Sequence, residues 1–184
     1  MNDQLDDTLE MSGGCQCGAV RYQAVLALGT AHLCHCRMCQ KAVGNYFEAL
    51  VGADNATLAW TRGAPGRFMS SQFVERGFCG DCGTPLYYRD VNAGHTSLTI
   101  GSLDHPDQVP PRRNEGIEGR MPWLVGVGSV PDSGRTEDGD SADWAAAIKA
   151  SSRQHPDHDT DHWPAAAVGQ GQVDPVGANE NGTT

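Results

Sequence analysis

The sequence predicts an all-β protein built from small antiparallel sheets. Three observations support this class: short runs in which apolar and polar residues alternate, Gly, Asn, Asp or Pro at the ends of these runs, and a spacing of about ten residues from one run to the next. The runs that fit a strand are 19–26, 46–53, 57–60, 67–74, 85–89 and 95–101. In this part of the chain, only residues 37–43 favour a helical turn or two.

Charge divides the 184-residue chain into three segments. The net charge is −4 over residues 1–10, +1 over 11–131 and −7 over 132–184, which together make the −10 of the whole chain. The nearly neutral segment 11–131 is long enough for one domain and is the expected folded part. We expect an acidic tail at 1–10. For 132–184 we expect an acidic linker and a poorly structured C-terminal extension, with a short helix after Ser141.

Composition argues against several classes of partner. Nucleic acid is not expected, because binding phosphates requires a concentrated basic face. The first ten residues lack the basic start and apolar run of a secretory signal, and no stretch is long enough to cross a bilayer, so we expect a cytoplasmic protein without a membrane partner. In a reducing compartment, seven cysteines at short spacings indicate metal ligation or redox chemistry before structural disulfides.

Two cysteine pairs form the first expected metal site. Cys79 and Cys82, followed at once by Gly83, have the form of a zinc knuckle, in which a tight turn aims both sulfur atoms at one ion. Cys15 and Cys17 can converge on the same ion only from a bent backbone, which the glycines around them permit. Both pairs head a Cys-Gly-x-x-x-Tyr frame. Together the four thiolates make a closed site, which is the structural type.

The remaining cysteines, Cys34, Cys36 and Cys39, lie within six residues of each other. Catalytic zinc sites typically use three protein ligands and keep the fourth position open, so the division into four and three matches one structural and one catalytic ion. A Zn²⁺ ion with three thiolates carries a net charge of −1, which favours a soft guest such as a thiol. Because a thiol bound to zinc is deprotonated, this site is expected to activate a small thiol for attack on an electrophile.

Other interpretations of these residues stay open. His35 or His32 in the fourth position would make the second site structural. An iron–sulfur cluster fits the short spacing, and a redox dithiol at Cys36 and Cys39 is opposed by the third thiol and by the absence of a βαβ pattern. A c-type haem is excluded because Gln40 follows Cys39. The stretch 154–164, QHPDHDTDHWP, has the composition of a metal site, but its place beyond the linker favours a solvated or surface-docked tail.

Five stretches resemble the glutathione-dependent formaldehyde-activating enzyme (Gfa) family, which includes centromere protein V. They are GGCQCGAVRY (13–22), CHCRMCQKAVGNYF (34–47), FCGDCGTPLYY (78–88), GSLDHP (101–106) and MPWL (121–124). The resemblance covers residues 11–131 and implies a β-tent fold organised around zinc sites. It also implies two Zn²⁺ per chain, with the structural ligands at Cys15, Cys17, Cys79 and Cys82 and the catalytic ligands at Cys34, Cys36 and Cys39.

The resemblance also implies an activity. The reaction of the family is condensation of formaldehyde with glutathione to S-(hydroxymethyl)glutathione, so we expect a carbon–sulfur lyase whose partners are glutathione or another small thiol and a small aldehyde. Many members carry a histidine a few residues after the LDxP segment, where this chain has PPRRNEG (110–116). Arg37, Lys41 and Arg113 are candidate contacts for substrate carboxylates. The alternative is a non-catalytic binding module stabilised by two structural zinc ions.

Overall fold

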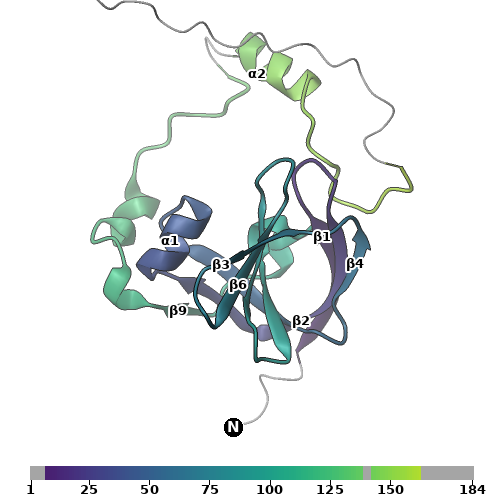
Figure 1. Cartoon of the computed structure of the whole chain (residues 1–184). Coiled ribbons are helices and arrows are strands. Elements are labelled where there is room, and N and C mark those ends of the chain that lie inside the picture. The colour runs from purple at the N-terminus through teal and green to yellow at the C-terminus, as the bar shows by residue number, and fades with distance from the viewer. Residues whose placement is uncertain (1–6, 139–141, 163–184) are drawn as a thin grey trace, which may run out of the picture.

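The strands of the protein join in one nine-stranded network with few helices (Figure 1). The structure is a computed structural model that describes residues 7–138 and 142–162. Its strands are β1 (Thr8–Gly14), β2 (Arg21–Cys34), β3 (Glu48–Asp54), β4 (Ala59–Arg62), β5 (Gly66–Met69), β6 (Val74–Phe78), β7 (Pro85–Asp90), β8 (His95–Thr99) and β9 (Arg113–Glu115). The all-β class predicted from the sequence is therefore confirmed, and the helical turn expected at 37–43 is α1 (Arg37–Val43).

The 14-residue strand β2 connects most of the network. Its first half pairs antiparallel with β1, from Arg21 opposite Gly14 to Ala27 opposite Thr8. Its last three residues pair antiparallel with β3 and parallel with β9. Cys34, the final residue of β2, is therefore held between two neighbouring strands.

β4 also pairs antiparallel with β2, and the remaining strands continue from β3 in the order β8, β7, β6 and β5. The prediction of one strand over 67–74 is wrong, because a turn separates β5 from β6. In this turn the hydroxyl of Ser71 accepts hydrogen bonds from the backbone N–H groups of Phe73 and Val74, at 3.2 and 3.1 Å. Such local bonding competes with the sheet ladder and turns the chain back.

The core is formed mainly by buried side chains of the strands, with a few from the adjoining turns. Among its fully buried members are Tyr22, Leu26, Val51, Leu86 and Leu98. Burying a large apolar side chain stabilises the fold by about 1.5–3 kcal/mol. The one polar atom that Tyr22 brings into the core is satisfied by the hydroxyl of Ser102 at 2.7 Å.

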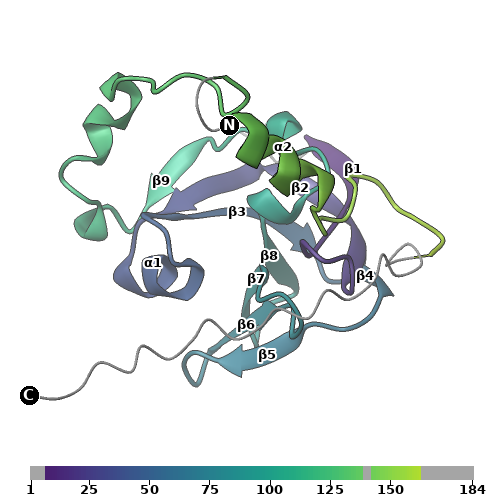
Figure 2. The same ribbon diagram turned by 90° about the horizontal axis from the view of Figure 1, so that it is seen from above.

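After β9 the chain runs outside the strands (Figures 1 and 2). It forms the short helices η3 (Ile117–Gly119) and η4 (Leu124–Ser129), then α2 (Ala142–Ala150), where the sequence suggests a short helix. It then returns to the side of the network that carries β1 and β4. In residues 7–138 and 142–162 no helix has the length and apolar character needed to span a bilayer. Most of the expected acidic tail, at 1–6, and the extension at 163–184 lie outside the described residues.

Candidate metal centres

Cys15, Cys17, Cys79 and Cys82, here called the four-cysteine group, converge from two distant loops. The first pair follows β1 and the second pair lies between β6 and β7. All four sulfur atoms lie within 4.8 Å of one another. Sγ of Cys17 is 3.5 Å from Sγ of Cys15 and 3.7 Å from Sγ of Cys79. These separations are far longer than an S–S bond of about 2.05 Å, and no disulfide joins any of the seven cysteines.

The two loops are built alike. In the first, the N–H of Gly18 donates to the carbonyl of Cys15, and in the second the N–H of Gly83 donates to the carbonyl of Cys79, both at 3.0 Å. The φ angles of Gly18 and Gly83 are 75° and 76°, a region that residues with a Cβ rarely adopt. The repeated Cys-Gly frame of the sequence thus corresponds to two matching turns that present sulfur atoms to each other.

The donor set of this group fits a tetrahedral thiolate site. With metal–sulfur bonds of about 2.3 Å, the sulfur atoms of a four-coordinate zinc site lie about 3.8 Å apart. The sulfur–sulfur separations of 3.5 and 3.7 Å are close to that value. Cys15 and Cys79 are buried and the other two are partly buried, so the group can hold a metal ion enclosed by protein.

Cys34, Cys36 and Cys39, here called the three-cysteine group, are brought together by the start of α1. Cys34 ends β2, Cys36 is the residue that caps α1, and Cys39 lies in the first turn of the helix. Sγ of Cys36 accepts a hydrogen bond from the backbone N–H of Cys39 at 3.4 Å. The three sulfur atoms lie within 4.8 Å of one another and can hold a metal ion. Burial alone raises the pKa of the Cys36 thiol, but hydrogen bonds from backbone N–H groups lower the pKa below its ordinary value.

Both neighbouring histidines are turned to other partners. The imidazole of His35 is buried, its Nε2 lies 2.8 Å from Oδ1 of Asn114, and its ring packs edge-on against Phe47. Nδ1 of His32 lies 2.8 Å from the carbonyl oxygen of Thr30. Among the described residues, the group that converges with Cys34 contains only cysteines.

The three-cysteine group opens on a cavity of about 330 Å³, which all three cysteines line. His32, Arg76, Tyr88, His95 and Arg113 are among the other lining residues. Of the three predicted carboxylate contacts, Arg113 lies at this cavity, where it donates to Glu115 and to the carbonyl of Gly29. The other two, Arg37 and Lys41, line a separate, larger cavity.

An ion pair that the sequence analysis missed lies against this group. Nη2 of Arg76 is 3.3 Å from Sγ of Cys39, and Nη1 donates to Glu48 at 2.7 Å. Burial alone lowers the pKa of Arg76, but the bonds to Cys39 and Glu48 raise the pKa above its ordinary value, so the cation persists. In the sequence, the one signal of this pair is the presence of charged residues in strands: Glu48 starts EALVGA and Arg76 lies within VERGF.

A second missed residue supports the loop that carries the cysteines. The amide of Gln40 is buried and donates to the carbonyls of His35 and Gly119, each at 2.8 Å. Gln40 thereby ties the start of α1 to η3 in the segment after β9. The segment that carries the three cysteines is therefore fixed at both ends, by β2 at Cys34 and by Gln40 in α1.

The His/Asp-rich segment docks on the strands. His155 is buried, and its backbone N–H donates to the carbonyl of Gln16 at 2.7 Å. Oδ1 of Asp159 accepts from Nη2 and Nε of Arg21, at 2.7 and 3.0 Å. Within the described residues, this segment contributes to neither group of converging metal-ligand atoms. The surface-docked tail is therefore the interpretation that the structure supports.

Comparison with known proteins assigns the chain to a family. A family model described as glutathione-dependent formaldehyde-activating enzyme matches residues 10–116. An uncharacterized lyase of Schizosaccharomyces pombe is 31% identical over 83 residues, which are 45% of this chain and 60% of the yeast protein. This chain thus spans less than two thirds of that relative. A crystal structure of a Rhodobacter sphaeroides protein matches with a TM-score of 0.48 and 22% identity, over 56% of this chain and 99% of that one. Because the family model matches more than half of the 184 residues, the chain belongs to the glutathione-dependent formaldehyde-activating enzyme family.

Proposed function

We propose that this chain is a zinc-dependent carbon–sulfur lyase with two zinc ions per chain. The four-cysteine group holds the structural ion and the three-cysteine group holds the catalytic ion. The reaction is the reversible addition of a small thiol, glutathione, to formaldehyde or a similar small electrophile. Membership of the family and a relative named as a lyase both support this proposal.

The observation that carries the proposal is the difference between the two groups. Four sulfur atoms converge in one, whereas three converge in the other, and those three line a cavity. Neither His32 nor His35, the two histidines that would complete a structural site, contributes a ring nitrogen to the converging ligand atoms of the three-cysteine group, and one nitrogen of each lies instead against Thr30 or Asn114. Three protein ligands and an open position are typical of catalytic zinc.

The division of work between ion and protein follows from charge. A bound zinc ion supplies the Lewis acidity that favours the deprotonated form of an incoming thiol at neutral pH. The guanidinium of Arg76 donates to Cys39, and its positive charge partly offsets the repulsion among three neighbouring thiolates. Arg113, at the cavity, is the proposed contact for a carboxylate of glutathione.

The proposed reaction needs neither an oxidant nor a reductant. The sulfur of the thiol forms a bond to the carbonyl carbon, and the electron pair of the C=O π bond moves to oxygen. The proton lost by the thiol is matched by the proton gained by the new hydroxyl. The reverse direction breaks the C–S bond and returns the thiol and the aldehyde, which is the lyase reaction.

Isothermal titration of the zinc-loaded protein with glutathione tests this function. We expect saturable heat with glutathione and much less with S-methylglutathione, which has the same carboxylates but no thiol. Cys36→Ser should lose the thiol-dependent heat and the rate of S-(hydroxymethyl)glutathione formation above the uncatalysed background. Equal heats for the two peptides, or full activity in Cys36→Ser, would reject the open site and leave the binding module with two structural ions as the better description.

A further inference from the structure

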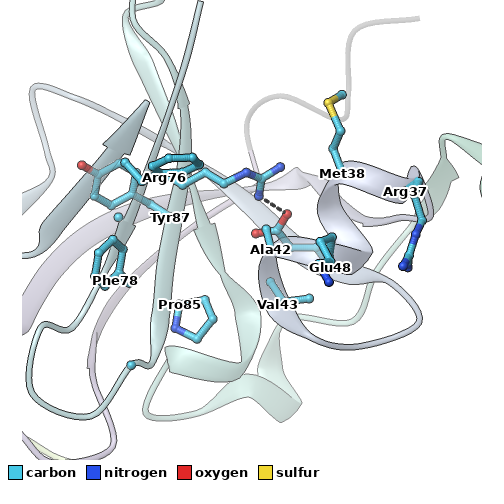
Figure 3. A pocket seen from close by; sticks show the side chains of 13 residues that line it. Arg37, Met38, Ala42, Val43, Glu48, Arg76, Phe78, Pro85 and Tyr87 are labelled. Atoms are coloured by element: carbon cyan, nitrogen blue, oxygen red, sulfur yellow. Dashed lines mark hydrogen bonds and ion pairs between the residues drawn. The ribbon is translucent and has the colours of Figure 1, made fainter. Parts of the chain in front are cut away.

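A second cavity, of about 690 Å³, lies between α1 and the strands β6 and β7. Figure 3 shows Phe78, Pro85 and Tyr87 on one side of this cavity and Ala42 and Val43 of α1 on the other. The ion pair of Arg76 and Glu48 spans the two sides. We call this space the apolar cavity.

The lining of the apolar cavity suits an apolar guest. Most of the surface that lines it is apolar, and its lining residues include Val43, Phe68, Phe78, Pro85 and Tyr87. Phe68 is 61% exposed and Phe78 is 36% exposed. A ligand that covers large aromatic side chains at a concave site removes apolar surface from water, and this favours binding.

Of the three cations in the lining, Arg37 and Arg76 are bound to other side chains, and Lys41 is exposed, so its ammonium group can stay in water while a guest covers the apolar surface. Arg76 is neutralised by Glu48 at 2.7 Å and by its contact with Cys39. Arg37 points away from Phe78 and Pro85 (Figure 3), and its Nη1 lies 3.3 Å from Oε1 of Gln40. Glutathione, with two carboxylates and three amide or amine groups, would leave most of these polar groups without partners here.

The apolar cavity adjoins the cavity of the three-cysteine group. Met38 and Arg76 line both spaces. Met38 is 70% exposed, and an unbranched thioether side chain adapts readily to the shape of a guest. A molecule whose reacting atoms lie at the cysteines can therefore extend past Met38 into the apolar cavity. Formaldehyde, close in size to a water molecule of about 30 Å³, would leave this space unused.

We propose that the apolar cavity binds an aromatic or branched aliphatic group of the substrate, so that this chain acts on compounds larger than the adduct of formaldehyde and glutathione. The proposal rests on the proposed function, because it takes the three-cysteine group as the reacting centre. The apolar group is carried either by the thiol or by the carbonyl compound. Both sources present the same chemistry to the cavity, and the experiment below separates them.

The first measurement probes the cavity without thiol or turnover. N-phenyl-1-naphthylamine, a neutral apolar dye, is titrated into the zinc-loaded protein and its fluorescence is followed. We expect saturable binding that weakens about fivefold or more in Phe68→Ala. The matched control is Phe73→Ala, on the same hairpin and with a similarly exposed side chain, 55% against 61%. Equal weakening in both variants, or no binding at all, would overturn the proposal.

The second measurement compares substrates of different size. In one arm, benzyl mercaptan and 2-mercaptoethanol are titrated into the protein. In the other, kcat/KM for aldehyde release is measured with the glutathione adducts of phenylacetaldehyde and formaldehyde. We expect a preference of about tenfold or more for the larger compound in whichever arm carries the natural apolar group, reduced in Phe68→Ala and kept in Phe73→Ala. No preference in either arm would overturn the proposal.

The two measurements keep the cavity and the reaction distinguishable. Dye binding that depends on Phe68, together with no heat from any thiol and no turnover, would reject the proposed function and with it the assignment of the guest as a substrate. Thiol heat and turnover without size preference or dye binding would reject the apolar site and leave the proposed function in place.

Discussion

Nη2 of Arg76 lies 3.3 Å from Sγ of Cys39, so a cation from β6 contacts a sulfur atom on α1. The two residues are 37 positions apart in the chain, and the pairing of strands brings them together. The same guanidinium binds Glu48 at 2.7 Å, and all three side chains are buried. One guanidinium therefore contacts both a carboxylate and a thiol of the three-cysteine group.

Removing the cation should destabilise the protein strongly. Arg76→Met leaves Glu48 buried without its partner, and the free energy of unfolding is expected to fall by about 3–5 kcal/mol. Urea denaturation of the zinc-loaded protein measures this change. The control is Arg67→Met, whose side chain is 68% exposed and lies 3.9 Å from Glu75, with an expected loss of about 0–1 kcal/mol. Similar losses in the two variants would show that the Arg76 pair contributes no more than a surface pair.

Gln40 should act on metal binding as well as on stability. Gln40→Leu leaves the carbonyls of His35 and Gly119 without this donor, which costs about 1–3 kcal/mol for the buried carbonyl of His35 and less for the part-buried carbonyl of Gly119. Because the loop beside Cys36 and Cys39 then loosens, the affinity for the zinc proposed at the three-cysteine group should fall about tenfold or more in a chelator competition. Gln108→Leu, at an exposed position of the chain, should change neither quantity. Loss of stability with unchanged zinc affinity would limit Gln40 to a structural role.

Asp104 should make the free energy of unfolding depend on pH in the acid range. Burial alone raises the pKa of Asp104, but hydrogen bonds from Arg21 and Ser12 and the charge of Arg21 lower the pKa below its ordinary value of 3.8. A carboxyl with a lowered pKa in the folded state stabilises the protein above that ordinary value, and this stability is lost as pH falls through the lower, folded value.

The comparison of wild type with Asp104→Asn tests this dependence. At pH 7 the variant should be less stable by about 2 kcal/mol, because it loses charge-assisted hydrogen bonds. Thermal unfolding from pH 7 to pH 3 should show the difference between the two proteins shrinking below pH 3.8. Acid release of metal affects both proteins alike, so the difference reports Asp104. A difference that stays constant across this range would mean that Asp104 has an ordinary pKa.

The docked C-terminal segment should be loosened by one substitution. Asp159→Asn removes the charge that Arg21 binds at 2.7 Å. Since the carboxylate is 42% exposed, the pair contributes about 1 kcal/mol or less, and trypsin cleavage after Arg153 should accelerate by up to about fivefold. Cleavage is followed by mass spectrometry, with Asp161→Asn, at an exposed position, as control. Equal rates in the two variants would show that Asp159 does not hold the segment down.

The strand pattern predicted the fold class well, and each of its errors has a physical cause in the structure. β1 was not foreseen, because Thr8–Gly14 is rich in Gly and becomes a strand through its seven-residue pairing with β2. The break within 67–74 depends on the hydroxyl of Ser71, which a count of alternating residues does not detect. Tertiary pairing in one case and side-chain bonding in the other decided the structure.

The candidate site was predicted where its chemistry is local in sequence. Cys34, Cys36 and Cys39 converge through one helical turn, and the knuckles at Cys15 and Cys79 are short turns, so spacing alone grouped all seven cysteines as the structure does. Arg76, in contrast, reaches Cys39 only through the pairing of strands distant in sequence. The cysteine pairs could be matched across the chain because each has a recognisable short motif, whereas Arg76 belongs to no such motif.

X-ray absorption at the zinc edge, with and without a thiol ligand, tests the central claim most directly. In the protein alone we expect two zinc ions per chain and an average of about 3.5 protein sulfur ligands per zinc. Addition of glutathione in which selenium replaces sulfur should create a zinc–selenium distance, and S-methylglutathione should not. A single zinc per chain, or two ions whose spectrum the selenol leaves unchanged, would contradict the account.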